Sequence, residues 1–135
     1  MTARQIVEQM YHNDAFSQWL GIELLEIGEG SATVVMRIRT DMLNGFGIAH
    51  GGITYSLADS ALAFASNSHG RHAVSIETSI AHTTALYAND VICAAATLDA
   101  LGNRTGVYRV VVTRQTDNKT VALFKGVVYR KDKTW

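Results

Sequence analysis

The 135-residue sequence lacks several features that each define a class of protein. It has a single cysteine, Cys93, so no disulfide can form within the chain, and that residue lies in a strand-like apolar run where a small core side chain is expected. No run of about 18 apolar residues is present to span a bilayer, and the N-terminus has no continuous apolar segment of a signal peptide. We therefore expect a cytoplasmic protein that does not enter the membrane. Proline is also absent, and no functional conclusion follows from it.

The chain has no excess of charge of either sign, since 12 Lys and Arg balance 12 Asp and Glu. This balance argues against a nucleic-acid surface, which needs surplus cations, and leaves small anionic ligands open. The five histidines include no pair at metal-ligand spacing beside an acid, so neither a metal nor another cofactor is expected. With 47% hydrophobic and 18% charged residues, the composition is globular, and the length predicts one domain over residues 1–135.

The order of predicted elements indicates an α+β fold. Residues 1–20 read as a helical arm, with Asp14 capping a short second helix. Strand-like apolar patterns predict two strands joined by a glycine turn and, later in the chain, four strands joined by short turns. Between these two groups, apolar residues at helical spacing predict a long helix. Strands that follow one another through short turns pair antiparallel. The economical arrangement is a curved antiparallel sheet of five to six strands wrapped around one central helix, with strands expected over residues 22–27, 32–38, 73–84, 91–101, 106–116 and 121–130.

The strongest chemical signal lies in residues 44–68, where a glycine-rich loop enters the central helix. His50, Gly51 and Gly52 stand where the helix should begin, and the first N–H groups of a helix lack internal partners and favour a developing negative charge. Further along the helix, Asp59 interrupts an otherwise apolar pattern, and a helix that is apolar nearly all round is expected to be buried nearly all round. A buried carboxylate is costly unless it is satisfied. Taken separately, the glycines can be a tight turn and Asp59 a locally satisfied acid; together they indicate a reactive site.

The spacing of these features constrains the site. Gly51 and Asp59 are separated by about 12 Å of helix rise at about 1.5 Å per residue, so one reacting carbonyl cannot touch both in one copy. If both act on one substrate, Gly51 of one chain must meet Asp59 of another, and a two-fold dimer would make two equivalent sites. The catalytic hypothesis therefore requires a homodimer.

The motif Asn44-x5-His50-Gly51-Gly52-x6-Asp59, followed by Val74-Ser75-Ile76-Glu77, resembles that of hotdog-fold acyl-CoA thioesterases, specifically the phenylacetyl-CoA (PaaI-type) group. The resemblance implies that each active site crosses a dimer interface and that homotetramers, as dimers of dimers, form. It implies that the Gly51 amide and Asn44 hold the thioester carbonyl oxygen. Asp59 of the partner would be base or nucleophile, with Ser75 orienting it or the water, and His50 would lie near the sulfur or brace the loop.

Other residues follow from the same resemblance. The family often has an aromatic residue and then proline after the Ser75 strand, whereas this chain has His82 and Ala85 near those places, so the acyl pocket or its rim differs. His82 is either a strand-surface histidine or a substrate contact. The candidates to line the acyl pocket are Phe46, Tyr55 and Leu62, and Gly52 is a further candidate substrate contact. The family binds the CoA nucleotide through cations on the later strands and turns, where this chain has Arg104 and Arg130; each of these either contacts the nucleotide or is simply solvated.

Three functions are compatible with this sequence. The first is hydrolysis of a small aryl- or acyl-CoA thioester of phenylacetyl or hydroxyphenylacetyl type. The second is a non-catalytic acyl-CoA-binding hotdog module, which has no need of a buried acid at Asp59. A hotdog dehydratase is the third, although the resemblance implies a different placement of its histidine and acid.

Overall fold

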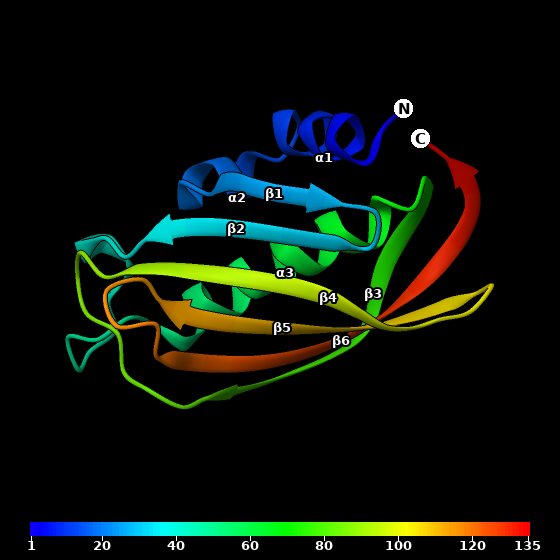
Figure 1. Ribbon diagram of the computed structural model, residues 1–135. Helices are drawn as coiled ribbons and strands as arrows, with labels where there is room; N and C mark the ends of the chain where they lie inside the picture. Colours follow the sequence, from blue (N-terminus) through cyan, green and yellow to red (C-terminus); the bar gives the residue numbers. More distant parts are fainter.

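The computed structural model describes residues 1–135 and shows two short helices, a long helix and six strands. Figure 1 shows the strands as one curved sheet that wraps around the long helix α3, with α1 and α2 packed beside it. The elements run in the order α1 (Ala3–His12), α2 (Ala15–Leu20), β1 (Glu23–Gly28), β2 (Ser31–Arg37), a short 3-10 turn η1 (Thr40–Met42), α3 (Gly51–Asn67), β3 (Arg71–His82), β4 (Val91–Leu101), β5 (Thr105–Arg114) and β6 (Thr120–Thr134).

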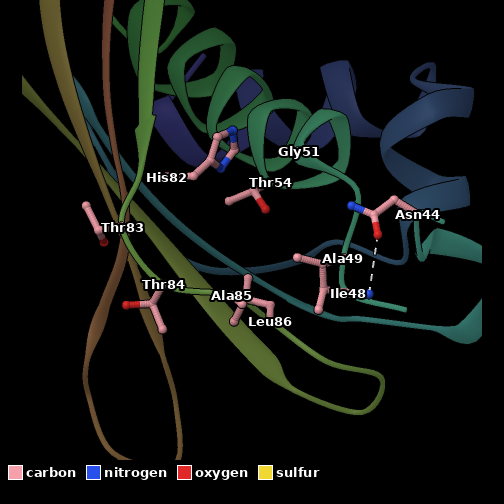
Figure 2. Close-up of a pocket in the computed structure, with 10 residues that line it drawn as sticks. All are labelled: Asn44, Ile48, Ala49, Gly51, Thr54, His82, Thr83, Thr84, Ala85 and Leu86. Atoms are coloured by element: carbon pink, nitrogen blue, oxygen red, sulfur yellow. Dashed lines mark hydrogen bonds between the residues drawn. The ribbon is translucent and has the colours of Figure 1, made fainter. Parts of the chain in front are cut away.

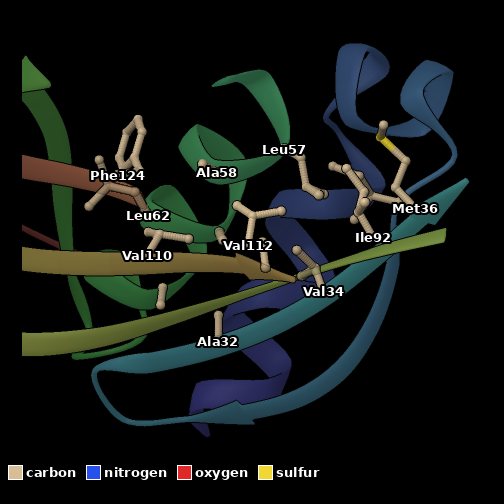
Figure 3. Close-up of a cluster of buried hydrophobic side chains, with 14 of the residues drawn as sticks. Ala32, Val34, Met36, Leu57, Ala58, Leu62, Ile92, Val110, Val112 and Phe124 are labelled. Atoms are coloured by element: carbon tan, nitrogen blue, oxygen red, sulfur yellow. The ribbon is translucent and has the colours of Figure 1, made fainter. Parts of the chain in front are cut away.

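The sheet is antiparallel throughout, with spatial order β1-β2-β4-β5-β6-β3. This confirms the predicted hotdog fold, with six strands rather than five. Only the bounds differ: β6 continues to Thr134, beyond the predicted end at Arg130. Because successive strand residues point to opposite faces, one set from each of the strands β2 to β6 packs against α3. Figure 3 shows this core, which joins Leu57, Ala58 and Leu62 of the helix to Ala32, Val34, Met36, Ile92, Val110, Val112 and Phe124 of the sheet.

The helical arm forms as predicted, in two pieces. Asp14 caps α2 by accepting a hydrogen bond from the Ser17 amide, and Gly21 ends that helix in the left-handed conformation, with φ of 76°. A left-handed residue after the last turn is a common helix stop that glycine adopts without strain. The arm contacts α3 through a hydrogen bond of 2.9 Å between the hydroxyls of Ser17 and Ser60.

Helix α3 is less covered than its apolar sequence predicts. The sheet buries one side, but Ser56, Asp59 and Ala63 are only half-buried, and Gly52 is exposed. These positions recur every three to four residues, so they share one face of the helix. The expectation that α3 is buried nearly all round is therefore wrong for the single chain, because the arm covers only part of the side that faces away from the sheet.

Strand β3 forms one edge of the sheet, with β6 as its single neighbour. The pairing with β6 shifts by one residue between Ser75 and Glu77, so that Ile76 is the extra residue of a β-bulge. Ser75 pairs with the buried Val128 and therefore shares its inward face. Ile76 is 59% exposed at the free edge.

Candidate active site

Gly51 is the first residue of α3, and its N–H makes no hydrogen bond within the chain. The neighbouring amides of the first turn are already used: Gly52 N–H donates to Nδ1 of His50 at 2.9 Å, and Ile53 N–H donates to the His50 carbonyl. The helix end therefore offers one free amide proton where the macrodipole is positive. An acceptor oxygen placed at Gly51 would complete this helix terminus.

The loop before α3 is held by its own polar groups. The side-chain oxygen of Asn44 accepts hydrogen bonds from the backbone amides of Phe46, at 2.9 Å, and Ile48, at 3.4 Å. This arrangement is typical of a turn that an Asn side chain stabilises. These bonds leave the Asn44 amide nitrogen without a partner in the chain. Gly47, with φ of 76°, lies at the tip of the same loop. The loop thus presents a fixed donor group beside the start of the helix.

A cavity of about 320 Å³ opens beside Gly51. Figure 2 shows Gly51 and Thr54 of α3 on one side, Asn44 on the preceding loop, and His82 and the residues after it opposite. His82 is the last residue of β3, and its Nε2 lies 3.2 Å from the point where a Cβ on Gly51 would be. We call this cavity and its lining the amide half-site; its wall is completed by Ile48, Ala49, Thr83, Thr84, Ala85 and Leu86.

Asp59 lies in a different cavity, of about 250 Å³, about two turns further along the helix than Gly51. Its carboxylate makes no hydrogen bond or salt bridge within the chain, and burial raises its pKa above the ordinary value of 3.8. Ser75, turned inward by the bulge of β3, lies in the same cavity, as does Leu62. The rest of this acid half-site is mostly apolar, formed by Ala63, Ser66, Ala73, Val74 and Val128.

The two half-sites share no lining residue. Because α3 is one unbroken helix from Gly51 to Asn67, the rise of about 12 Å between Gly51 and Asp59 applies as counted from the sequence. The single chain therefore brings Asn44 together with Gly51, and Asp59 together with Ser75, but does not bring the two pairs together.

His50 and Gly52 lie in neither half-site. His50 caps α3 through the bond from Gly52 N–H, and both residues line a third cavity of about 300 Å³ between α3 and the arm. Phe16 and Trp19 of α2 form the far wall there, stacked with ring centroids 6.0 Å apart. The sequence interpretation missed these two aromatic residues, since nothing in the arm itself indicates which part of α3 it will reach.

Two of the aromatic candidates lie away from both half-sites. The Tyr55 hydroxyl pairs with Thr78 at 2.6 Å, and its ring packs edge-on against Phe124 at 5.5 Å. Phe46 is 89% exposed at the loop tip. Leu62 alone of the three predicted acyl contacts lines a half-site.

Arg104 and Arg130 lie together where β5 begins and β6 nears its end. Arg104 forms a two-point ion pair with Asp132, at 2.8 and 3.3 Å, and Arg130 donates to the Gly102 carbonyl at 2.7 Å. The Arg104 guanidinium, in turn, lowers the pKa of Asp132. Arg130 pairs with Ala73 across the β3–β6 ladder, which puts its backbone next to the acid half-site.

No group of three or more His, Cys, Asp or Glu side chains is close enough together to hold a metal ion. No helix has the length and apolar character needed to cross a membrane. What the arrangement does offer is a carboxylate at Asp59 and hydrogen-bond donors at the start of α3, which are the groups that acyl transfer requires.

A six-stranded sheet around one helix, with an amide donor at the helix start and an acid within it, defines a hotdog-fold thioester hydrolase. Residues 46–121 match the thioesterase superfamily. The chain is 43% identical over 126 residues to a putative esterase of Archaeoglobus fulgidus, covering 93% of this chain and 81% of the relative. It is 41% identical over 128 residues to the acyl-coenzyme A thioesterase PaaI of Escherichia coli, covering 95% and 91% of the two chains. The protein belongs to the thioesterase superfamily.

Solved structures agree with this assignment. The E. coli PaaI protein from the phenylacetic acid degradation operon superposes with a TM-score of 0.95, covering 98% of this chain and 95% of that one. A Streptococcus mutans protein bound to acetyl CoA superposes with a TM-score of 0.81 at 25% identity, covering 84% of this chain and 91% of its own. The resemblance inferred from the Asn44 to Asp59 motif is confirmed at the level of the family.

Proposed function

We propose that this protein hydrolyses a small aryl- or acyl-CoA thioester to the free acid and CoA, in two sites that each combine the halves of two chains. The observation that carries the proposal is the separation of the half-sites: a free amide at Gly51 and an unpartnered acid at Asp59 lie on one helix, in cavities with no common residue. The amide half-site has a hydrogen-bond donor but no acid, and the acid half-site has a carboxylate but no free helix-terminal amide.

The acid half-site supports a role as base or nucleophile. Asp59 has no hydrogen-bond donor in the chain to stabilise its charge, and burial raises its pKa, so its carboxylate is more basic than an exposed one. It attacks the thioester carbon directly or removes a proton from the attacking water. Ser75, whose hydroxyl can donate to the carboxylate or to water, is held in the same cavity by the β3 bulge.

The amide half-site supports the oxyanion. As the thioester carbon becomes tetrahedral, its oxygen gains negative charge beside the Gly51 N–H and the positive end of α3. The Asn44 side-chain amide is a second donor at the same cavity. Fixed donors stabilise the transition state more than the substrate, because the charge exists only as the bond forms.

The free edge of β3 supports the dimer. This edge is 12 residues long and exposes Val74 and Ile76, whereas unpartnered edges are usually short, charged or covered. Pairing two β3 strands about a two-fold axis would place the open faces of the two α3 helices next to each other in opposite directions. That arrangement brings Gly51 of one chain toward Asp59 of the other.

The outer face of the sheet supports a further association, in which two dimers form a homotetramer. Leu123 and Tyr129 alternate along β6 with buried residues, so they point away from α3, and both are more than 40% exposed. Apolar side chains on the uncovered face of a sheet are a common sign of an interface.

The CoA thioester substrate class is supported by the relatives. E. coli PaaI is an acyl-coenzyme A thioesterase, and the S. mutans structure contains acetyl CoA. The phenylacetyl and hydroxyphenylacetyl groups are the acyl groups that the PaaI-type resemblance favours.

A thiol-release assay tests the proposal. Phenylacetyl-, hydroxyphenylacetyl-, benzoyl- and straight-chain acyl-CoAs are offered to the wild type and to Asp59→Asn, which keeps the shape of the side chain and removes its basicity. We expect turnover of at least one of these thioesters and a loss of about 10³-fold in kcat for Asp59→Asn, with binding of CoA ester retained. Wild-type turnover by Asp59→Asn would refute the assignment. Binding without turnover by the wild type would favour the acyl-CoA-binding module instead.

A further inference from the structure

We propose that His82 is a third hydrogen-bond donor to the thioester oxygen, acting beside Gly51 and Asn44 in the amide half-site. This inference rests on the proposed thioester hydrolysis and assigns a catalytic residue at that site. It chooses between the two readings of His82 that the sequence left open, a surface histidine and a substrate contact.

The register of β3 turns His82 toward the helix. His82 pairs with Ala122 of β6, which is fully buried, and paired residues share a face of the sheet. Figure 2 shows the imidazole beside the first turn of α3, between Gly51 and the wall that follows β3. Its Nε2 is the side-chain atom nearest to the Cβ position of Gly51, at 3.2 Å. Because Gly51 and His82 also line the same cavity, we expect an oxygen bound there to the Gly51 amide to lie within reach of this ring.

The ring is free to act. No hydrogen bond or salt bridge within the chain involves either nitrogen of His82, although the side chain is at the end of a well-paired strand. The other two histidines near the ends of α3 are engaged: His50 accepts from Gly52 N–H, and Nε2 of His69 pairs with the Tyr108 hydroxyl at 2.8 Å. His82 is thus the one imidazole at α3 with both nitrogens available.

The helix terminus leaves room for this donor. His50 takes the Gly52 N–H, so α3 itself offers the oxygen only the Gly51 amide. A carbonyl oxygen has two lone pairs and accepts further hydrogen bonds as it becomes negative. With the proton on Nε2, the imidazole donates to that oxygen from the β3 side, while Asn44 donates from the loop side.

The role requires no proton transfer by His82. As Asp59 or its water adds to the carbon, the carbonyl electron pair moves onto the oxygen, and the three donors stabilise it. When the intermediate collapses, the pair returns to re-form the carbonyl and the carbon–sulfur bond breaks, with its electrons leaving on the sulfur as a thiolate. The thiolate takes the proton that Asp59 removed from water; if Asp59 attacked the carbon itself, the thiolate is protonated from solvent and a water then cleaves the acyl–Asp59 anhydride to the free acid. His82 keeps its Nε2 proton throughout and acts by donating that N–H from a fixed position.

The test compares His82→Phe, which keeps a ring of similar size without a donor, with His82→Gln, which restores an N–H donor without an imidazole. His12→Phe is the matched control, because His12 is exposed on α1 and does not line the amide half-site. Asp59→Asn is assayed in parallel, and thermal unfolding of every variant is recorded. Steady-state kcat and KM are measured on the best acyl-CoA substrate of the wild type.

We expect His82→Phe to lose about 10- to 100-fold in kcat with KM changed less than about threefold, as for removal of one of several oxyanion donors. His82→Gln should recover at least about a third of wild-type kcat, and His12→Phe should match the wild type. Wild-type kcat in His82→Phe, or equal losses in the Phe and Gln variants at unchanged thermal stability, would overturn the inference. If Asp59→Asn is inactive in the same series, the proposed function stands regardless; if Asp59→Asn is fully active, that function fails first.

Discussion

The amide half-site and the acid half-site are built on the same helix but in opposite ways. Around Gly51, the lining mixes polar and apolar residues and contains three groups without a hydrogen-bond partner in the chain: the Gly51 N–H, the Asn44 amide nitrogen and the His82 ring. Around Asp59, the lining is largely apolar and the one charged group has no partner. Under the proposed function, the first region receives the negative oxygen and the second keeps a carboxylate basic. Both regions are unsatisfied within the single chain, as a site shared between two chains requires.

This contrast shows how one short motif supplies two separate half-sites. The helix sets the distance between donor and acid, and the curved sheet sets which cavity each residue faces. Local folding alone positions Gly51, because His50 caps the helix beside it. The acid side depends on the bulge of β3, which turns Ser75 toward Asp59. The two half-sites can therefore be disabled separately.

Of the changes that disable one half-site and leave the other intact, Gly51→Pro is expected to have the largest effect. Proline is well tolerated at the first position of a helix and lacks the amide proton, and the His50 backbone, at φ −59° and ψ 136°, already has the conformation preferred before proline. We expect kcat to fall by about 10²- to 10³-fold, the usual cost of one oxyanion donor.

Gly51→Ala is the control for that change, since it adds a similar Cβ against His82 and keeps the N–H. It should retain most of the activity that Gly51→Pro loses. Equal losses in the two variants would mean that crowding, and not the missing donor, accounts for the effect.

A smaller effect is expected from Ser75→Ala in the acid half-site. The hydroxyl orients the Asp59 carboxylate or the water, so its removal should reduce kcat by about 10-fold and leave the protein folded. Ser79→Ala, on the same strand but facing outward with Lys125, should behave as the wild type. Steady-state assays of both variants check this; a Ser75→Ala enzyme at full kcat would remove Ser75 from the site.

The smallest and most specific effect is in the pH dependence. Burial raises the pKa of Asp59 above 3.8, and the reaction needs its ionised form. Activity should therefore rise with pH through this raised pKa and be lost as pH falls through it, with half-maximal kcat/KM above pH 3.8. The residual activity of Asp59→Asn should lack this limb. A wild-type profile that is flat or rises toward acid would contradict the role of the carboxylate.

Sequence reasoning predicted the parts of the fold that local patterns determine. Alternation gave the six strands, Asp14 was correctly expected to cap α2, and the hydrophobic helix was located within a few residues. Its open face was missed, because the apolar residues of α3 do not reveal that the arm covers only part of one side. The separation of Gly51 from Asp59 could also be predicted, because the rise along a helix depends only on the number of residues between them.

The surroundings of the site were harder to predict. That Tyr55 turns to Thr78 and that Phe46 stays exposed follow from how the sheet wraps the helix, which no local pattern encodes. The approach of His82 to Gly51 depends on where β3 ends against α3, a contact between residues 31 positions apart in the sequence. The family resemblance indicated that His82 departs from the family pattern, but only the register of β3 shows that its side chain points toward α3.

Complementation between two inactive variants tests the central claim most directly. Gly51→Pro and Asp59→Asn are produced separately and together in equal amounts, and the oligomeric state of each preparation is measured by sedimentation. If each site joins Gly51 of one chain to Asp59 of its partner, a mixed dimer contains one intact site and one doubly altered site. Random pairing makes half of the dimers mixed, so the mixture should recover about a quarter of wild-type activity. Activity no greater than the sum of the two variants, with dimers present, would contradict the shared site.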